Sequence, residues 1–160
     1  MESAPNFAIR PLTAADLDAV ETIDRMHAGR SRRHFFEKRF VAERNHPDDY
    51  VHVGAAIDGR LKGFAIARVL RGEHGQKDAA AVIDAVGVDR DSAGRGLGRA
   101  LVKELIKLSH DRGIGSLQSQ AAWENFELLR FFRASGFVLA PRLALERSIS
   151  DLPERLEEEE

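Results

Sequence analysis

The first half of the chain passes from a helical to a strand-like spacing of hydrophobic residues. Apolar residues recur every three to four positions over residues 17–27 and 31–45, which predicts two amphipathic helices. Thr13, together with the aspartate three residues later, is typical of a capping box at the start of the first helix. Gly29 and Pro47 are expected to end the two helices.

Strand-like patterns follow the second helix. Residues 50–57 and 61–70 flank Asp58-Gly59, a dipeptide that supplies the positive φ angles of a tight hairpin turn. Residues 79–88 form a nearly continuous apolar run interrupted by Asp84, which predicts a buried strand. The other expected elements are a short strand over 7–10, an amphipathic helix that follows a glycine-rich turn and stops at Gly113, a strand over 114–122, a helix over 125–135 and a strand over 143–149.

This order of elements predicts a single mixed α+β domain over residues 1–150. The chain has 160 residues, of which 43% are hydrophobic and 31% charged, and this is sufficient for one core. No internal repeat points to a second domain. Residues 151–160 are largely acidic, and we expect this tail to be disordered.

The composition argues against several classes of binding and catalytic site. A formal net charge of -2 provides no global basic surface for nucleic acid or an anionic membrane. The chain has no cysteine, which excludes disulfides, thiolate zinc sites and a cysteine nucleophile. The histidines lack metal-binding spacing, so we expect no metal and full activity in excess chelator. With neither a signal-peptide pattern nor a membrane-spanning run, the chain is predicted to be an untargeted, cytoplasmic protein.

A glycine turn separates the buried strand from the long helix that follows it. Gly94, Gly96 and Gly98 alternate with other residues at the expected helix N-terminus, where free amides and the helix dipole favour an anion. Arg95 and Arg99 add positive charge. The spacing excludes the GxGxxG and GxxxxGK[ST] phosphate loops. Either the turn binds a phosphate or it is a flexible turn with no ligand.

Two motifs resemble those of a known family. The stretch Ala93-Gly94-Arg95-Gly96-Leu97-Gly98 is similar to the acetyl-CoA signature Q/R-x-x-G-x-G/A of the GCN5-related N-acetyltransferases (GNAT). The stretch from Asn125 to Phe137 resembles the family's N-x-x-A-x-x-x-Y-x-x-x-G-F motif and follows at the expected distance. The order of strands and helices matches over about residues 7–149, so the chain is identified as resembling this family.

The resemblance implies a mostly antiparallel seven-stranded sheet, splayed between its fourth and fifth strands, with about four helices. It implies that acetyl-CoA lies in the splay, with the backbone amide of Val86 at the thioester carbonyl. The implied activity is transfer of an acetyl or short acyl group to a primary amine of a small molecule or a protein, by an enzyme that in this family is often a homodimer. The implied cofactor-binding residues are Val86, Gly87, Val88, Ala93, Gly94, Arg95, Gly96, Leu97, Gly98, Arg99, Asn125 and Phe132.

The chain departs from the family pattern at two positions. Ala93 stands where the family usually has Gln or Arg, which removes one side chain near the phosphates but leaves the amides. Phe132 stands where the family often has a tyrosine that protonates the departing CoA thiolate. A thiol with a pKa of about 8.5 leaves without much help from an acid, so activity is still expected.

Asp84 is the first candidate for the base that deprotonates the amine, because it is expected to share a strand face with Val86. It is equally well interpreted as an aspartate paired with a neighbouring arginine. Glu124 and His52 are reserve candidates, and Tyr50 is expected to pack. Without a cysteine or a nucleophile elbow, direct attack in a ternary complex is favoured over a covalent intermediate.

The basic residues around position 30 and the function of the whole chain each have more than one interpretation. The basic residues Arg30, Arg32, Arg33, Lys38 and Arg39 either meet an acidic acceptor or form a solvated helix face. The chain as a whole is predicted to be an enzyme, but the same fold would also serve as a regulatory module that binds acyl-CoA without turnover. A phosphate binder that shares only the glycine turn is a third hypothesis.

Overall fold

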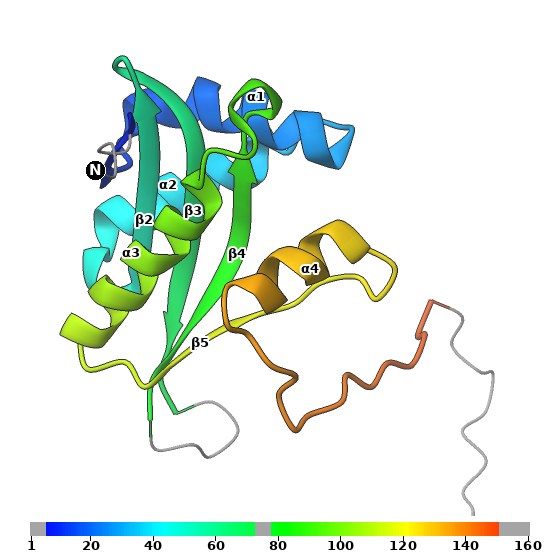
Figure 1. Ribbon diagram of the computed structural model, residues 1–160. Coiled ribbons are helices and arrows are strands. Elements are labelled where there is room, and N and C mark those ends of the chain that lie inside the picture. The colour runs from blue at the N-terminus through cyan, green and yellow to red at the C-terminus, as the bar shows by residue number, and fades with distance from the viewer. Residues whose placement is uncertain (1–5, 73–77, 151–160) are drawn as a thin grey trace, which may run out of the picture.

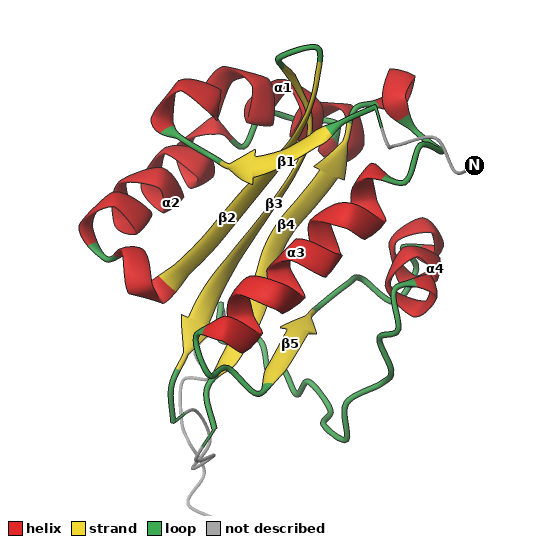
Figure 2. Cartoon of the chain, turned by 60° about the vertical axis from the view of Figure 1, so that its left-hand side comes forward, coloured by secondary structure: helices red, strands yellow, loops and turns green. Residues whose placement is uncertain are grey.

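The computed structural model describes residues 6–72 and 78–150 and shows one twisted sheet with helices on both faces (Figures 1 and 2). The strands are β1 (Ala8–Pro11), β2 (Tyr50–Ile57), β3 (Arg60–Leu70), β4 (Ala80–Val88) and β5 (Ser116–Ser119). The helices are α1 (Leu17–Ala28), α2 (Arg33–Asn45), α3 (Leu97–Asp111) and α4 (Phe126–Ala134), with short 3-10 turns η1 (Ala14–Asp16), η2 (Pro47–Asp49) and η4 (Arg90–Ser92).

The predicted capping box and the predicted end of the first helix are confirmed, but the box caps the 3-10 turn η1, which leads directly into α1. The Thr13 amide donates to Asp16 Oδ2 at 2.8 Å in a capping box. The Arg10 guanidinium binds both oxygens of the same carboxylate, and its hydrogen bonds hold the pKa of Asp16 below the ordinary value. Gly29 ends the helix in the left-handed conformation, with φ of 72°. Local sequence therefore fixes where the first helix lies along the chain.

The sheet has the order β1-β2-β3-β4-β5 and is antiparallel except for the parallel pair β4 and β5. The hairpin of β2 and β3 turns at Asp58-Gly59, with φ of 51° and 76°, as predicted. The α+β class and the four helices are confirmed. The sheet has five strands among the described residues, however, and not the seven that the family resemblance implied.

The last part of the chain accounts for one of the two missing strands. Residues 143–149 were expected to form a strand, but they have no regular structure, and Leu143 and Leu145 are 90% and 93% exposed. Strand β5 is also shorter than the predicted 114–122. Alternating hydrophobicity is a local property, whereas a strand also needs an adjacent edge with which to pair. The acidic tail 151–160 lies outside the described residues.

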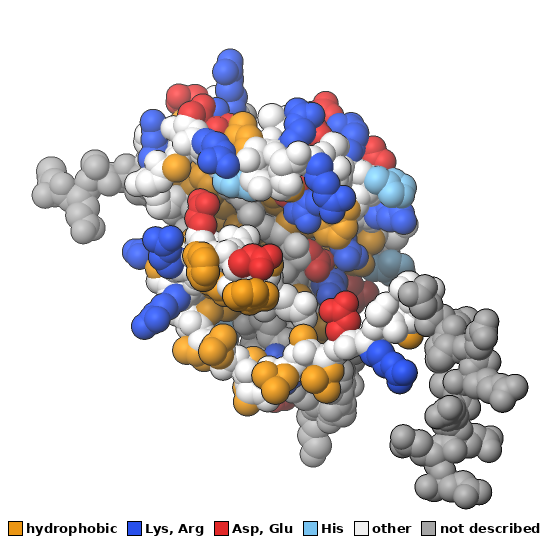
Figure 3. All heavy atoms as spheres, turned by 90° about the vertical axis from the view of Figure 1, so that its right-hand side faces the viewer, with side chains coloured by type: hydrophobic (Ala, Val, Ile, Leu, Met, Phe, Trp, Pro, Cys, Tyr) orange, Lys and Arg blue, Asp and Glu red, His pale blue; other side chains and the backbone are white. Residues whose placement is uncertain are grey.

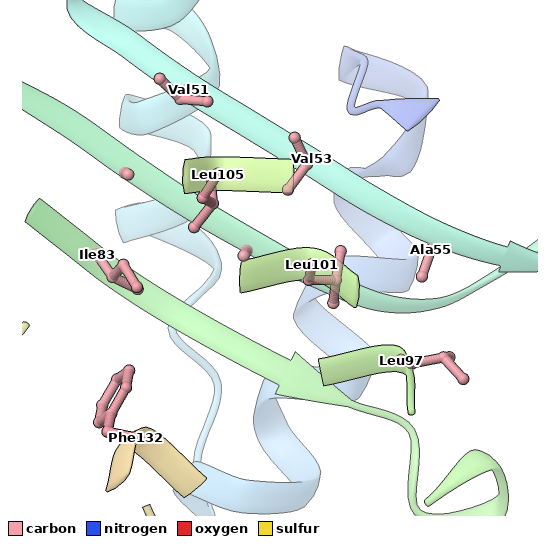
Figure 4. Packing of buried hydrophobic residues seen from close by; sticks show 10 residues of the cluster. Val51, Val53, Ala55, Ile83, Leu97, Leu101, Leu105 and Phe132 are labelled. Carbon is pink, nitrogen blue, oxygen red and sulfur yellow. The ribbon is translucent and has the colours of Figure 1, made fainter. Parts of the chain in front are cut away.

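Helices cover the two faces of the sheet with separate hydrophobic clusters. Helices α1 and α2 pack on one face around Phe36 and Phe64, whose rings meet edge to face at 5.6 Å. Helix α3 crosses the other face, where Leu101 and Leu105 are fully buried against β2 and β3 (Figure 4). Helix α4 adds Phe132 to this second cluster. The described part of the chain contains no helix that is long and apolar enough to cross a membrane.

Strand β4 has a one-residue bulge at Asp84. The register pairs Ile66 with Ala85 and the next residue of β3 with Ile83, so Asp84 has no partner. Asp84 and Ala85 both face the α1 and α2 layer, because the first contacts an arginine of α2 and the second packs in the cluster of that layer. Val86 packs in the α3 cluster. The prediction that Asp84 and Val86 share a strand face is therefore wrong.

The sheet opens between β4 and β5. Their parallel pairing spans Ala80–Ile83 on β4 and Ser116–Ser119 on β5, and it ends there. Residues 85–88 of β4 are paired with β3 alone, and β5 leads away toward α4 (Figure 1). This open edge of β4 lies where the family resemblance placed a splay between the fourth and fifth strands.

Candidate functional site

The open edge of β4 presents backbone hydrogen-bonding groups of Val86 and Val88. The Asp89 amide donates to the carbonyl of Lys62, the residue directly opposite, at 2.8 Å. Directly opposite residues in an antiparallel ladder alternate between bonded and non-bonded pairs. Val88 and Val86 therefore direct their N–H and C=O groups away from β3, while Gly87 directs its groups toward β3. The site can hydrogen-bond an extended ligand laid along this edge.

Gly87 has a packing role of its own. A Cβ atom at this position would lie 2.9 Å from the Phe64 ring and 3.3 Å from Ile23. Only a glycine lets α1 approach the end of β4 so closely. Of the three strand residues predicted to bind the cofactor, Gly87 supports the edge and its two neighbours form it.

The glycine turn brings the open edge to a helix N-terminus. Gly94 and Gly96 have φ of 79° and 85°, and no atom lies within 4 Å of a Cβ built on either. The first α3 bond joins the Ala100 amide to the Gly96 carbonyl at 3.1 Å, so the amides of residues 97–99 have no acceptor within the helix. The buried side chain of Leu97 anchors this turn. The arrangement leaves amides and open space together, as an anion site requires.

An ion pair and a cap fix the segment that leads into the glycine turn, and two arginines of the turn itself are exposed. Lys62 reaches Asp91 Oδ2 at 3.2 Å, and Asp89 caps η4 by accepting from the Asp91 amide at 3.1 Å, which fixes the connection from β4 to α3. The Ser92 hydroxyl, which donates to Asp91, and then Lys62 hold the pKa of Asp91 below its ordinary value. Arg95 and Arg99 are exposed, so both guanidinium groups can turn toward an anion at the helix N-terminus.

Helix α4 closes the other side of the turn. A Cβ at Gly98 would lie 2.8 Å from the Phe131 ring, so glycine permits α4 to pack on the first turn of α3. Asn125 caps α4 by accepting from the Leu128 amide at 3.2 Å. Phe132 is 7% exposed and packs 4.9 Å from the Phe137 ring, in the same cluster as Ile83 (Figure 4). At the position of the family's tyrosine, this chain has a core residue.

A space-filling view of this side of the molecule shows how the open edge meets the surface (Figure 3). The surface is hollowed near the centre of the view. Lys and Arg side chains gather on the flank toward α1 and α2, and hydrophobic side chains lie on the flank toward α4. The hollow therefore has basic side chains on one flank and hydrophobic side chains, with charged ones among them, on the other.

Asp84 is held in ion pairs on the α2 side of the sheet. Its Oδ1 accepts from Arg68 Nε at 2.9 Å, and its Oδ2 lies 3.3 Å from Arg39 Nε. Its side chain is 12% exposed. Both oxygens thus face guanidinium groups, and the interpretation as a paired strand aspartate has direct structural support.

His52 lies in the same layer and is buried, with 6% exposure. Among the described residues, neither ring nitrogen has a hydrogen-bond partner. Burial, and then the positive charge of Arg39, lower the pKa of His52 to about 4. The rings of Tyr50 and Phe40 pack against it at 5.7 Å, so Tyr50 packs as predicted. Glu124, the other reserve candidate, is exposed in the segment before α4.

Carboxylates partner much of the basic sequence between α1 and α2. Arg32 Nε donates to Asp24 Oδ2 at 2.8 Å, and Arg33 donates to Asp18 at 2.7 Å. These hydrogen bonds raise the pKa of both arginines. Arg39, the third, pairs with the carboxylate in the bulge of β4. This part of the basic run therefore ties α1, α2 and the sheet together.

Sequence reasoning missed His27, which reaches the open edge from the last turn of α1. Its Nε2 lies 2.8 Å from the Val88 carbonyl oxygen, although the two residues are 61 positions apart. A second contact lies beside it, because Arg90, two residues after Val88, donates to the carbonyl of Met26 at 3.0 Å. The end of α1 is thus joined to the end of β4. The only signal in the sequence was a histidine at the expected end of the first helix, just before the basic residues considered for acceptor binding.

Comparison with known proteins decides the family. A model of the Acetyltransferase (GNAT) family matches residues 17–137, from the start of α1 to the end of the second motif. The chain belongs to the GNAT family. It is 29% identical over 132 residues to the [ribosomal protein bS18]-alanine N-acetyltransferase of Escherichia coli K12, which covers 81% of this chain and 79% of that protein.

Solved structures agree with this assignment. The ribosomal-protein-S18-alanine N-acetyltransferase of Escherichia coli aligns with a TM-score of 0.68 and 26% identity, over 84% of this GNAT chain and 79% of that one. The structure of AAC(6')-Iy in complex with the bisubstrate analogue CoA-S-monomethyl-acetylneamine aligns with a TM-score of 0.69 and 18% identity, over 89% and 97%. The second likeness shows the fold alone.

Membership identifies the protein as an acyl-CoA N-acetyltransferase, and proteins of the GNAT fold use acetyl-CoA as cosubstrate. The open turn at Gly94 and Gly96 fits the phosphates of such a ligand, and the outward-facing groups of Val86 and the Val88 amide fit its amides. Within residues 6–72 and 78–150, no cluster of three or more His, Asp or Glu side chains could hold a metal ion.

Proposed function

We propose that this protein transfers an acetyl or short acyl group from acetyl-CoA to a primary amine by direct attack in a ternary complex. The observation that carries the proposal is the continuous path from the outward-facing groups of Val86 and the Val88 amide to the open glycine turn. An extended pantetheine arm would lie along the first, with the Val86 amide at the thioester carbonyl. The pyrophosphate would bind at the second, on residues 94–99.

Direct attack follows from the chemistry that the chain offers. It has no cysteine, and no elbow sequence presents a serine, so a covalent acyl-enzyme has no evident nucleophile. Phe132 cannot donate a proton, but a thiol with a pKa of about 8.5 is acidic enough for its thiolate to leave without a general acid. What the reaction does need is a base near the acceptor amine.

The acceptor is a primary amine of a small molecule or a protein. The curated relative in Escherichia coli is named for the alanine of a ribosomal protein, and we take an N-terminal alanine as the first protein acceptor to examine. The CoA-neamine analogue in the AAC(6')-Iy complex suggests neamine as the first small-molecule acceptor. An acyl-CoA-binding module without turnover is the second candidate function, and the core position of Phe132 favours it.

The test has two stages. A ligand at 100 times its dissociation constant stabilises a protein by about 2.7 kcal/mol, so excess acetyl-CoA should raise the melting temperature by about 5 to 10 °C. CoA release is then measured with a thiol reagent, using a peptide with a free N-terminal alanine and neamine as acceptors. Stabilisation with turnover of either acceptor supports the enzyme. Stabilisation without turnover of any amine favours the binding module, and no stabilisation at millimolar acetyl-CoA contradicts both.

A further inference from the structure

The side chain of His27 lies at the part of β4 where an acyl-CoA would bind. The register of the β3 and β4 ladder directs the Val88 carbonyl to the open edge, and His27 Nε2 lies 2.8 Å from this oxygen. The side chain is exposed and stands at the C-terminal end of α1, directly before the segment that leads into α2. It therefore borders the open edge of β4 close to the glycine turn.

The contact with Val88 determines which nitrogen of His27 can act as a base. A carbonyl oxygen only accepts hydrogen bonds, so His27 Nε2 must carry the hydrogen. In the neutral ring this leaves a lone pair on Nδ1, which has no hydrogen-bond partner among the described residues. Catalytic triads orient their histidine in the same way, with an acceptor on one nitrogen and the reacting proton at the other.

The other candidate bases are placed less favourably. Asp84 faces α2 across the bulge, and both of its oxygens are engaged by Arg68 and Arg39. His52 is enclosed between β2 and α2 under aromatic rings. Of the candidate bases considered, only His27 makes a contact with a backbone group of the open edge.

We propose that His27 is the general base of the acetyl transfer, a role that rests on the function proposed above. Nδ1 takes one proton from the acceptor ammonium, directly or through one water, and the ring becomes an imidazolium. The free amine then forms a bond to the carbonyl carbon of the thioester, the carbon–sulfur bond breaks, and CoA leaves as a thiolate. The second proton lost by the nitrogen neutralises the thiolate, so the net products are the amide, CoA and one proton held by His27.

The experiment compares two substitutions that separate the base from the hydrogen bond to Val88. His27→Gln keeps an N–H donor near the position of Nε2 but has no titratable nitrogen, whereas His27→Ala removes both. Turnover of the N-terminal alanine peptide or of neamine, acetyl-CoA affinity and melting temperature are measured for each. His34→Gln is the matched control, because His34 is a histidine of α2 whose side chain is 80% exposed.

Loss of a general base should lower kcat by about 100-fold or more in His27→Gln, with the acetyl-CoA dissociation constant within about twofold of wild type. Free imidazole should restore part of the turnover of His27→Ala, while His34→Gln stays at the wild-type rate. If His27→Gln retains more than half of the wild-type kcat, or if imidazole restores nothing, His27 is not the base. A wild-type protein that binds acetyl-CoA but acetylates no amine contradicts the proposed function itself, and the role of His27 with it.

Discussion

The two halves of β4 differ in what their edges do. Its first four residues are paired on both sides, by β3 and β5, and are followed by a carboxylate enclosed between two arginines. Its last three are paired on one side only and lead into a turn whose glycines leave open space. The bulge at Asp84 lies between the halves. One strand therefore supplies fold stability at one end and free hydrogen-bonding groups at the other.

This difference indicates that function lies where the edge of a strand is unpaired and stability where it is paired. A paired edge has satisfied backbone groups, so substitutions there act on the free energy of unfolding. An unpaired edge beside a helix N-terminus still has donors to offer, so substitutions there act on ligand binding. The following predictions test whether the division at Asp84 holds.

The largest effect is expected at the glycine turn. Gly96→Val should weaken acetyl-CoA binding by at least about 100-fold, because its side chain would occupy the open space beside the free amides of α3. The positive φ of 85° adds a backbone cost of about 1–3 kcal/mol to any such residue. Binding is measured by calorimetry and stability by urea unfolding.

Gly113→Val is the control that isolates the backbone cost. Gly113 has φ of 76° and equally open surroundings, but it stands at the far end of α3. It should lose comparable stability and keep its affinity for acetyl-CoA. Equal loss of affinity in both variants would show that strain, and not occupation of the anion site, is responsible.

Sequence reasoning succeeded where short segments determine structure. Asp58-Gly59 predicted the hairpin because only a few residues adopt two consecutive positive φ angles. Thr13 predicted the start of the helical segment, which opens with η1, and Gly29 predicted the end of α1. The glycine turn was placed correctly before α3 for the same reason.

It failed where the outcome depends on distant partners. The bulge at Asp84 inserts one residue into the ladder, and nothing in an apolar run shows which residue will be skipped. The contact of His27 with Val88 joins helix and strand across 61 positions. Residues 143–149 have the alternation of a strand, but the described structure provides no partner for them. Periodicity predicts an element, and tertiary contacts decide whether it forms.

The next effect concerns His52, on the side of the sheet that we consider structural. Its pKa of about 4 in the folded protein lies below the ordinary 6.5, so the unfolded chain binds the proton first as the pH falls. Its neutral form therefore stabilises the fold above pH 6.5, and this stability is lost as the pH falls from 6.5 to 4. The difference between the two pKa values corresponds to roughly 3 kcal/mol. Urea unfolding at several pH values across this window measures it.

A variant that cannot titrate gives the comparison. His52→Leu should show a flatter dependence of stability on pH between 6.5 and 4 than the wild type, by most of that difference. His34→Leu, at an exposed position on α2, should follow the wild-type curve. Parallel curves for wild type and His52→Leu would show that His52 does not titrate differently in the folded state.

The smallest of these effects, and the one that tests the division most directly, is expected from Asp84→Asn. The substitution leaves Arg39 and Arg68 beside a neutral amide. Removing one partner of a buried ion pair costs about 3–5 kcal/mol, and partial exposure of the two arginines reduces this to about 2 kcal/mol. Asp18→Asn is the control, because Asp18 also pairs with an arginine but is 85% exposed, and it should lose less than about 0.5 kcal/mol. Turnover by Asp84→Asn should stay within about threefold of wild type, since its carboxylate faces away from the edge that carries Val86. A 100-fold fall in kcat at unchanged stability would instead make Asp84 the base, and the functional half of β4 would then begin at the bulge and not beyond it.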